Sequence, residues 1–520
     1  MANLLIVHSN RLVYGVQYPG ISSISAWIKR AGHKFTFFDA AEYSAYLLGK
    51  EEKGNEELCE GGIIPLGVKP ITNIEKKPRL KPLDNLLSDL SKTIEGTSPD
   101  VIGFSCFTEN WPFTLFLIRK VYARFPNIPI IVGGTHATIA PDEVLKHSQV
   151  TAVCIGDGEK PLIKLLESLD NGRLDLSISN MWFRYEGRYI KNDFNYSALD
   201  DDQLFLDWDI YSDLHFIYPY EGKLYRRGSF SLSRGCPYRC TFCINNFLYK
   251  TMPGYKVSRK KVDFAIDELE YLTKKFDLEF LRFWDETFLA LPEKYLQVFA
   301  KRYQSQVALP FTIETTASSI TPQKVRLLAD MGCQSVSIGV ETSNEEYRKR
   351  ILKKNISNEQ YTKSFKILSE HGIRKVANFM FLLPKQTIED MYQDIIHCNS
   401  WKIESPSPRI FYPYLGTELR QYCFKNDLIN GDLVKLIEDE NGINSLEDLK
   451  AADLTCINSV LKFSPEMHEK AMMLLINFIL LQETPPSMHG LIMDLLKEED
   501  EYSLSMLNSL RSLVSQKKYG

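Results

Sequence analysis

The chain has 520 residues, of which 44% are hydrophobic and 25% are charged, and its net charge is −4. This balance is ordinary for a globular protein with a sizeable core, and it excludes a global basic field that would hold nucleic acid. No run approaches the roughly 18 apolar residues of a membrane span, and the start at Met1–Asn3 lacks the basic lead of a secretory signal. We therefore expect a cytoplasmic protein with no nucleic-acid partner and no membrane span.

The first 172 residues alternate apolar strand patterns with amphipathic helix patterns, which is typical of a parallel α/β sheet. The expected strands are residues 3–7, 34–38, 101–105, 129–132 and 152–155, and the expected helices are 22–31, 83–94, 114–125, 141–147 and 159–169. A polar stretch, residues 50–81, interrupts the alternation as a loop-rich insertion. Five strands with crossover helices predict a doubly wound, Rossmann-like domain.

Residues 173–227 are aromatic and acidic, with a hairpin-like stretch at 182–190. We interpret them as a connector whose aromatic side chains mainly pack. From residue 228 to about 420 the strand–helix alternation resumes, with expected strands at 229–233, 280–284, 311–315, 335–339, 376–382 and 409–412. Six such units predict a partial (β/α)6 TIM-type barrel with its active site at the C-terminal strand ends. Residues 421–520 predict a small C-terminal helical domain, with helices at 466–481 and 488–496, that covers the barrel mouth.

Three of the ten cysteines lie within eight residues: Cys236, Cys240 and Cys243. They follow an expected strand, so they lie on a loop at the active-site edge of the barrel. Thiolates at this C-x₃-C-x₂-C spacing can hold three corners of a cubane cluster and leave the fourth iron open. A zinc site usually takes four ligands in two pairs, and the sequence has no second pair. Chance proximity is the remaining alternative.

With Phe242 before the last cysteine, this segment resembles the C-x₃-C-x-φ-C signature of radical S-adenosylmethionine enzymes. The resemblance implies that Cys236, Cys240 and Cys243 bind a [4Fe-4S] cluster whose open iron chelates S-adenosylmethionine. It also implies an electron donor such as flavodoxin or ferredoxin. The reduced cluster of the family cleaves S-adenosylmethionine to methionine and a 5′-deoxyadenosyl radical.

Two later segments extend the resemblance. Asp285 and Glu286 occupy the aromatic–acidic–acidic–x–Phe segment of cobalamin-dependent members, and Glu341 occupies their fourth-strand G-x-E-S segment. The resemblance implies that these three carboxylates, with Phe242, bind the cofactor. Helix capping by Asp285 and Glu286 and a structural salt bridge of Glu341 are the alternatives.

The chain departs from the family at residues 383–387, which read Leu-Pro-Lys-Gln-Thr where members often have G-x-P-x-E-T. Leucine replaces the glycine and Gln386 replaces the acid, so the local turn and the contact from that acid are left open. Arg350 and Lys353 are further candidates for the cofactor carboxylate, although exposed helix charges are common.

Small residues end three consecutive strands of the N-terminal domain and open a crevice where a ligand can approach the backbone. The candidate binding residues there are Ser105, Gly133, Gly134, Thr135, His136, Gly156 and Gly158. The absence of G-x-G-x-x-G after the first strand argues against a dinucleotide site. The G-G-x-H and G-[DE]-G-E segments resemble the cobalamin-binding domain of one radical branch, which implies cobalamin as a third cofactor.

Base-off cobalamin proteins carry D-x-H-x-x-G after the first strand, and this chain lacks it. We therefore expect His8 to be a packed strand-end histidine rather than a cobalt ligand. His136 either contacts the cofactor or marks the entry to a helix.

The resembled branch implies an enzyme that methylates an unactivated carbon by means of a 5′-deoxyadenosyl radical and methylcobalamin. The alternative is a non-methylating rearrangement, cyclisation or oxidation with the same cofactors, and a remote alternative is a non-catalytic cobalamin or iron–sulfur binding protein. The substrate is a small molecule or a peptide, and its identity is left open.

Overall fold

The computed structural model describes residues 1–9, 15–43, 80–194, 196, 204–432, 434, 459–498 and 500–519. The expected polar insertion at 50–81 lies almost wholly outside these residues, as does the acidic run at 200–202. In the described ranges, no helix is long and apolar enough to cross a membrane.

The N-terminal sheet is parallel through its first five strands, in the order β2-β1-β3-β4-β5. These strands are β1 (Asn3–His8), β2 (Lys34–Asp39), β3 (Val101–Ser105), β4 (Ile130–Gly133) and β5 (Ala152–Cys154), and their ends lie within one residue of expectation. The order is that of a flavodoxin-like doubly wound sheet, which places a ligand crevice at the C-terminal strand ends.

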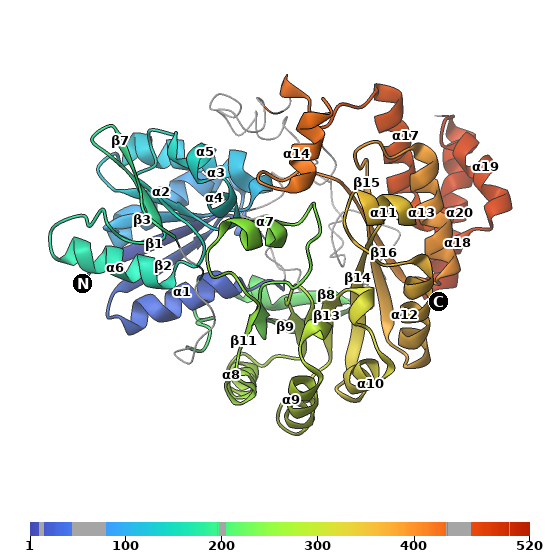
Figure 1. The fold of residues 1–520 in the computed structure, drawn as a ribbon, viewed down its shortest axis with the longest axis horizontal. Coiled ribbons are helices and arrows are strands. Elements are labelled where there is room, and N and C mark those ends of the chain that lie inside the picture. The colour runs from blue at the N-terminus through green and yellow to red at the C-terminus, as the bar shows by residue number, and fades with distance from the viewer. Residues whose placement is uncertain are drawn as a thin grey trace.

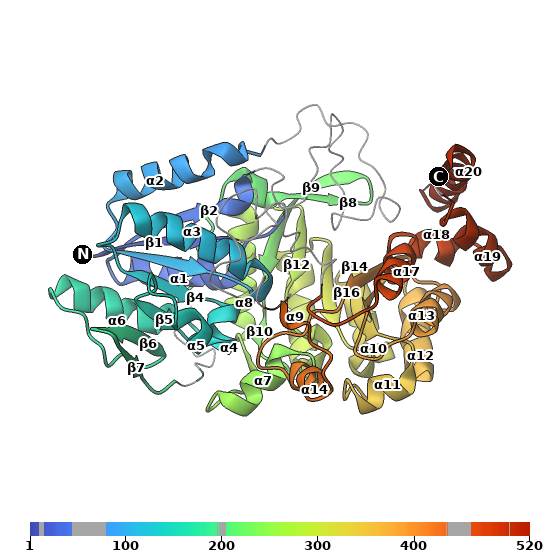
Figure 2. The same cartoon turned by 90° about the horizontal axis from the view of Figure 1, so that it is seen from above.

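Alternate residues of β1 face the two sides of this sheet. Leu4 and Ile6 pack in one core with residues of α1 (Pro19–Arg30) and α6 (Glu159–Asp170). Leu5 and Val7 pack in a second core with α2 (Leu86–Thr97) and α3 (Trp111–Arg124). The near-continuous apolar strand is therefore buried on both faces, as a parallel sheet between helices requires (Figures 1 and 2).

The sheet continues beyond residue 172, where the sequence predicted a connector. The expected hairpin forms β6 (Met181–Tyr185) and β7 (Arg188–Lys191), and β6 pairs antiparallel with β5. Met181 and Phe183 are fully buried at this edge. The first half of the connector is thus part of the N-terminal sheet, because it covers the otherwise open edge of β5.

The second half of the connector packs between the two sheets. Trp208 is fully buried, and its ring contacts Phe216 and Phe230, so the expected packing role of this aromatic residue is confirmed. His215 donates from Nε2 to Asp39 at 2.9 Å, which joins the connector to the end of β2. Burial alone would raise the pKa of Asp39, but hydrogen bonds from His215 and His8 bring it down to about 2.

The second large sheet is the expected open barrel. Six parallel strands run in the order β16-β15-β14-β13-β12-β9, and β8 (Ile217–Tyr220) adds antiparallel to β9 at the edge. They are β9 (Lys223–Phe230), β12 (Phe280–Phe283), β13 (Phe311–Thr315), β14 (Cys333–Glu341), β15 (Arg374–Phe381) and β16 (Ser405–Ile410). The largest differences from the expected strands lie at β9, which begins six residues earlier, and at β16, which begins four residues earlier.

Helices that follow the barrel strands cover its outer face (Figure 1). They are α8 (Val262–Lys275), α9 (Glu293–Gln306), α10 (Pro322–Asp330), α12 (Asn358–Glu370) and α13 (Ile388–Ser400). Apolar strand residues such as Phe283, Ile313 and Ile338 pack with these helices in one core.

The opposite, inner face of the barrel carries most of the polar residues of these strands. Register and alternation place the following polar residues on it: Ser229, Arg282, Thr312, Glu314, Ser337, Asn378, Ser407 and Arg409. The same face also carries Phe280, Val376 and Met380, so it is mixed, whereas the outer face is mainly apolar.

The described part of the C-terminal segment is helical, as expected. The helices are α14 (Glu418–Lys425), α17 (Pro465–Ile476), α18 (Phe478–Glu483), α19 (Pro486–Leu495) and α20 (Glu501–Tyr519). The segment divides in two: α14 lies against the loop at residues 235–243, where the Leu419 N–H donates to the Thr241 carbonyl at 3.0 Å, whereas the later helices pack on the outer side of the barrel. Phe478 packs on Phe379 and Phe381, outward-facing residues of β15, and Figure 1 shows α17–α20 beside α13. The expected helix 466–481 is broken at Asn477, whose side chain donates to the Met473 carbonyl.

Candidate cofactor site

The cluster loop, residues 235–243, leaves the C-terminal edge of the barrel after β9. It begins behind β10 (Ser233–Arg234), which pairs with β11 (Ser258–Arg259), and it ends at α7 (Ile244–Thr251). Gly235 has φ +87°, and a Cβ there would lie 3.2 Å from the Tyr255 hydroxyl, so the turn needs glycine. Cys243 is the N-cap of α7; burial raises the pKa of its thiol, and hydrogen bonds from the Asn245 backbone and side chain oppose that rise.

The three expected cysteines come together on this loop as free, partly exposed thiols. Burial raises the pKa of the Cys240 thiol to about 12. The positive charge of Lys354 opposes this rise, whereas Glu341 and the two other cysteines add to it. These groups act on Cys240 because they lie near it. Among the described residues, no three His, Cys, Asp or Glu side chains converge on a single metal ion. A mononuclear zinc site needs such convergence, whereas a cubane takes one thiolate at each of three irons.

Asp285 lies directly beneath the loop and is fully buried. Its carboxylate accepts hydrogen bonds from the Leu232 backbone N–H at 3.0 Å and from the Ser233 hydroxyl. Burial raises the pKa of Asp285, and these hydrogen bonds oppose that rise. The carboxylate therefore holds the strand that carries the loop, whereas the side chain of the next residue, Glu286, is exposed.

Two polar neighbours of the thiols were not predicted from the sequence. Thr287 Oγ1 lies 3.7 Å from Cys236 Sγ, and Asn245 Nδ2 lies 3.7 Å from Cys243 Sγ. Asn245 follows the third cysteine by two residues, which is the only sequence signal for it.

Glu341 ends β14 in a strained conformation. Its φ is +71°, and the pairing with β15 shifts register between Gly339 and Glu341. Lys354 Nζ donates to the Gly339 carbonyl at 2.6 Å and to Glu341 Oε1 at 2.9 Å, so Glu341 forms the salt bridge that was the alternative to its expected cofactor role. Strained non-glycine residues cluster at functional sites because the surrounding structure must hold them there.

The two cationic residues after β14 that were candidates for the cofactor carboxylate form ion pairs with other residues. Arg350 pairs with Glu346 on the exposed face of α11 (Glu345–Arg350), and Lys353 Nζ pairs with Glu418 at 2.6 Å. Lys354, which no sequence motif singled out, is the cation that interacts with Cys240.

The departure at Gln386 has a structural reason. Gln386 is buried, accepts from the Leu383 backbone N–H at 3.0 Å, and donates toward Asp394 Oδ2 at 3.4 Å. Asp394 also accepts from the Ser343 backbone N–H and the Thr342 hydroxyl, just beyond Glu341. An acid at position 386 would face a buried carboxylate, whereas the amide supplies a donor.

Asp394 predicts a pH dependence of stability. Burial raises its pKa from 3.8 to about 7, although Ser343 and Thr342 oppose this. The folded chain then holds a proton that the unfolded chain loses near pH 4, so the free energy of unfolding falls as pH rises from 4 to 7. The full effect is on the order of 4 kcal/mol.

We expect Asp394→Asn to flatten this slope in urea unfolding at pH 5, 6, 7 and 8. Asp390→Asn is the matched control on the same helix. Hydrogen bonds from Thr387 and Asn344 outweigh partial burial and lower the pKa of Asp390 below 3.8, so its titration lies outside the tested range. An unchanged slope in Asp394→Asn would contradict the prediction.

At the glycine-rich edge of the N-terminal sheet, the backbone segments that follow β3 and β4 lie in close contact. Gly134 has φ +90°, and a Cβ there would lie 2.7 Å from the Cys106 carbonyl oxygen and 2.9 Å from its nitrogen. Ser105, Gly133 and Thr135 are half-buried around this turn. The turn therefore brings bare backbone to the C-terminal edge of β3 and β4.

His136 is buried beside this turn and its ring stacks on Trp111. Burial lowers the pKa of His136 to about 3, with smaller effects of His147 and Arg420, so the imidazole is neutral. Nδ1 lies 3.2 Å from Thr108 Oγ1, while Nε2 has no hydrogen-bond partner among the described residues.

The turn after β5 contacts the barrel. Gly156 has φ +77°, and a Cβ there would lie 3.1 Å from Met252, which follows α7. Gly158 packs on Ile24 of α1, where a Cβ would lie 3.1 Å away, so its small size serves helix packing. The edge that carries the glycines thus meets the segment that carries the cysteines (Figure 1).

His8 packs at the end of β1, as expected. It is 2% exposed, its ring lies 4.1 Å from that of Tyr18, and its Nδ1 is 3.7 Å from Asp39 Oδ1.

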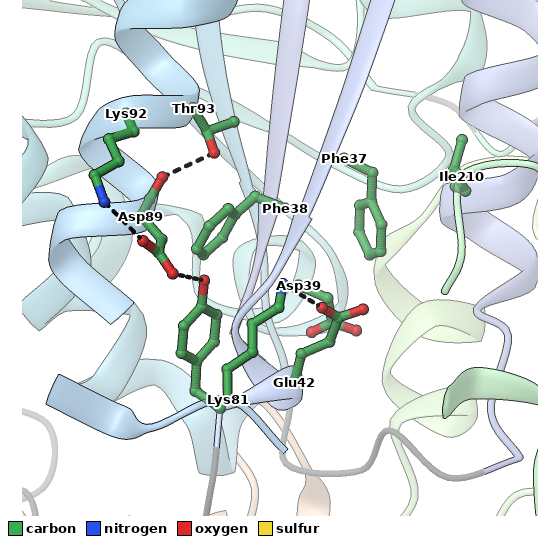
Figure 3. Close-up of a pocket in the computed structure, with 10 residues that line it drawn as sticks. Phe37, Phe38, Asp39, Glu42, Lys81, Asp89, Lys92, Thr93 and Ile210 are labelled. Carbon is green, nitrogen blue, oxygen red and sulfur yellow. Dashed lines mark hydrogen bonds and ion pairs between the residues drawn. The ribbon is translucent and has the colours of Figure 1, made fainter. Parts of the chain in front are cut away.

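A cavity of about 380 Å³ lies at the end of β2 and does not include the cluster loop (Figure 3). Its charged side chains are already paired: Lys81 with Glu42 at 2.8 Å, and Lys92 with Asp89 at 3.4 Å. Its Tyr43 also donates to Asp89. Asp39, which also lines the cavity, is hydrogen-bonded by His215, so the described residues around the cavity hold no unpaired charge for a ligand.

Comparison with known proteins identifies both parts of the site. The radical SAM superfamily model matches residues 230–396, and the B12 binding domain model matches residues 76–166. An uncharacterized methyltransferase of Pyrococcus horikoshii is 23% identical over 70% of this chain and 79% of its own length. An anaerobic magnesium-protoporphyrin IX monomethyl ester cyclase of Rubrivivax gelatinosus is 24% identical over 65% of this chain and 62% of its own length.

The fold is also that of a solved enzyme. The radical S-adenosylmethionine methyltransferase TsrM from Kitasatospora setae, solved with cobalamin and a [4Fe-4S] cluster, superposes with a TM-score of 0.64 at 14% identity. The match covers 94% of this chain and 90% of that chain. At this identity the likeness shows the shared fold of the two domains.

Proposed function

Because the chain belongs to the radical SAM superfamily and carries a B12-binding domain, we propose that it methylates an unactivated carbon of a small polar molecule. Its cofactors are a [4Fe-4S] cluster, S-adenosylmethionine and cobalamin. The observation that carries the proposal is the meeting of the thiol loop with the glycine-rich edge, where Met252 packs on Gly156. A methyl donor and a radical source can then act on one substrate.

When bound, S-adenosylmethionine at the cluster supplies a radical that removes hydrogen, and cobalamin supplies a methyl group. Cys236, Cys240 and Cys243 would hold three irons of the cluster, and Lys354 would offset the negative charge next to Cys240. The bare backbone at Gly133–Gly134 would let a corrin approach the sheet edge.

We assign the remaining site residues to the two cofactors by the edge on which they lie. Phe242, Glu286 and Glu341 lie on the barrel side and would serve S-adenosylmethionine, while Ser105, Thr135, His136 and Gly156 lie at the glycine-rich edge and would serve the corrin. Asp285 positions the loop from below, since its carboxylate accepts from Leu232 and Ser233.

The inner face of the barrel supports a polar substrate. Arg282 pairs with Glu314 there, and Asn378 donates to Ser337 at 3.0 Å. Thr312 Oγ1 and Arg282 Nε are buried without a partner among the described residues. A lipid would leave these groups unsatisfied at a cost of about 1–3 kcal/mol each, whereas a hydrogen-bonding substrate pairs them.

Arg409 indicates a negative charge on that substrate. It is half-buried on the inner face of β16, and no described residue forms a hydrogen bond or ion pair with it. A guanidinium in this position recognises a carboxylate or phosphate in a bidentate manner.

We predict that Arg409→Met raises the substrate KM at least about tenfold, since it removes a charge-assisted hydrogen bond of about 1.5–3 kcal/mol. Basal cleavage of S-adenosylmethionine without substrate stays within about twofold. Liquid chromatography with mass spectrometry measures both. A loss of basal cleavage would instead assign Arg409 to S-adenosylmethionine.

The function is tested with anaerobically reconstituted protein, methyl-deuterated S-adenosylmethionine, and cell extract split into anion-exchange and lipid fractions. We expect 5′-deoxyadenosine, S-adenosylhomocysteine and a deuterated product from the anionic fraction. A deuterated product only in the lipid fraction would contradict the polar substrate. Flavodoxin or ferredoxin is the expected reductant.

The cyclase similarity favours one second candidate, a radical cyclisation or oxidation with the same cofactors. It forms 5′-deoxyadenosine without S-adenosylhomocysteine and transfers no deuterium. The same assay therefore separates it from methylation.

A further inference from the structure

Arg234 joins the cluster loop to the N-terminal domain. It is the last residue of β10 and stands two residues before Cys236. One guanidinium nitrogen lies 3.2 Å from Asp157 Oδ1, and the other lies 3.1 Å from Glu159 Oε1. Asp157 lies in the turn after β5 and Glu159 is the first residue of α6, so one side chain spans the two domains.

Each end of this linkage is held by its own domain. Glu159 begins α6 and accepts from the Ser23 hydroxyl of α1 at 2.6 Å. On the barrel side, Arg234 pairs with Ser258 of β11, and the adjacent Ser233 donates to buried Asp285. The guanidinium therefore joins two backbone segments, each of which is held in place by hydrogen bonds within its own domain.

The linkage is also shielded from solvent. The side chains of Arg234, Asp157 and Glu159 are 30%, 26% and 12% exposed. Two carboxylates on one guanidinium form a network, and such networks are more strongly coupled than isolated surface pairs. Asp157 Oδ2 is buried and has no partner among the described residues, so Arg234 is the principal partner of this carboxylate.

We propose that Arg234 is a positioning residue that places the cluster loop and the turn at Gly156–Glu159 as one unit. Occupation of the corrin site then stabilises the geometry in which the cluster binds S-adenosylmethionine. The inference rests on the proposed function only in assigning the two cofactors to these two edges.

This linkage predicts a thermodynamic coupling between the two cofactors. Any ligand that fixes one edge favours the conformation needed at the other, and the coupling must be reciprocal. In the cluster-loaded protein we expect hydroxocobalamin to tighten S-adenosylmethionine binding about tenfold. S-adenosylmethionine should tighten hydroxocobalamin binding by the same factor.

The test compares Arg234→Met and Glu159→Gln with a matched control, Asp207→Asn. Asp207 accepts from Ser25 and Lys29 of the same helix α1, but it does not reach the cluster loop. Equilibrium binding gives the affinity for S-adenosylmethionine with and without hydroxocobalamin, and electron paramagnetic resonance of the reduced cluster reports its ligation. We expect both test variants to reduce the coupling below about twofold while the cluster signal persists, and the control to keep it.

Glu159→Gln is the milder variant and preserves the shape of the turn if Arg234→Met fails to fold. Arg234→Lys should restore part of the coupling, because lysine keeps the charge but reaches one carboxylate. Coupling retained in Glu159→Gln, or absent from the wild-type protein, would overturn the inference.

The two proposals fail separately. The coupling needs no methyl transfer, so a protein that shows it without forming S-adenosylhomocysteine refutes the methylation and leaves the role of Arg234. A protein that methylates without coupling refutes the role of Arg234 alone. Failure of the wild-type protein to bind either cofactor overturns both.

Discussion

Replacing Cys240 with alanine is expected to reduce 5′-deoxyadenosine formation by on the order of 10³-fold or more. Cys240 is the middle thiol of the cluster loop and lies next to Lys354 and Glu341. Its loss leaves one iron without a protein ligand, and the two remaining thiolates cannot hold the cubane in place. The measurements are iron and sulfide content, the electron paramagnetic resonance of the reduced cluster, and product analysis by mass spectrometry.

Cys333→Ala is the matched control. Cys333 is a buried free cysteine at the start of β14, far along the strand from Glu341. Its replacement removes a small buried side chain at a cost of about 1–2 kcal/mol and leaves the cluster intact. Normal product formation by Cys240→Ala would refute the assignment of the cluster to this loop.

Gly134→Ala is expected to weaken cobalamin binding by about 100-fold. A Cβ at this residue would lie 2.7 and 2.9 Å from backbone atoms of Cys106, so the turn between β4 and α4 (Thr135–Ile139) must move. The positive φ of +90° adds strain of about 1 kcal/mol. Titration of the protein with hydroxocobalamin, followed by visible absorption, measures the affinity.

Gly172→Ala is the control that separates the steric clash of a new Cβ from the backbone strain of a positive φ. Gly172 has a φ of +71°, and nothing lies within 4 Å of the Cβ that it would gain. It therefore carries the conformational cost without displacing the backbone at the corrin edge. Equal cobalamin affinities in the two variants would show that the Gly134 turn does not border the corrin, and the cluster signal should persist in both.

The strands of both sheets could be predicted because their apolar pattern follows from burial. The expected ends at 101–105 and 311–315 are the observed ends, since each strand is bounded by a sharp change to polar or turn residues. The start of β9 was missed because Lys223–Arg227 is polar and reads as connector. This polar part of β9 is a strand because it forms backbone hydrogen bonds with β8, and its local sequence pattern does not predict that pairing.

The candidate site was predicted in part for the same reason. Cys236, Cys240 and Cys243 are close in sequence, so their approach needs only one short loop. Asp285 was expected at the cofactor, yet its carboxylate faces backward to Leu232 and Ser233. The direction of a strand-end side chain depends on which neighbours offer donors, and a sequence motif does not contain that information.

The sequence by itself determined the chemistry of this protein: three closely spaced thiols, a glycine-rich edge, and the alternation that builds two parallel sheets. These are local properties, because spacing and periodicity act within a few residues. Only the tertiary structure decided that Lys354 stands beside Cys240 and that Arg234 reaches Asp157 and Glu159. These contacts join residues more than 70 positions apart, and they exist because the packing of whole sheets and helices brings their edges together.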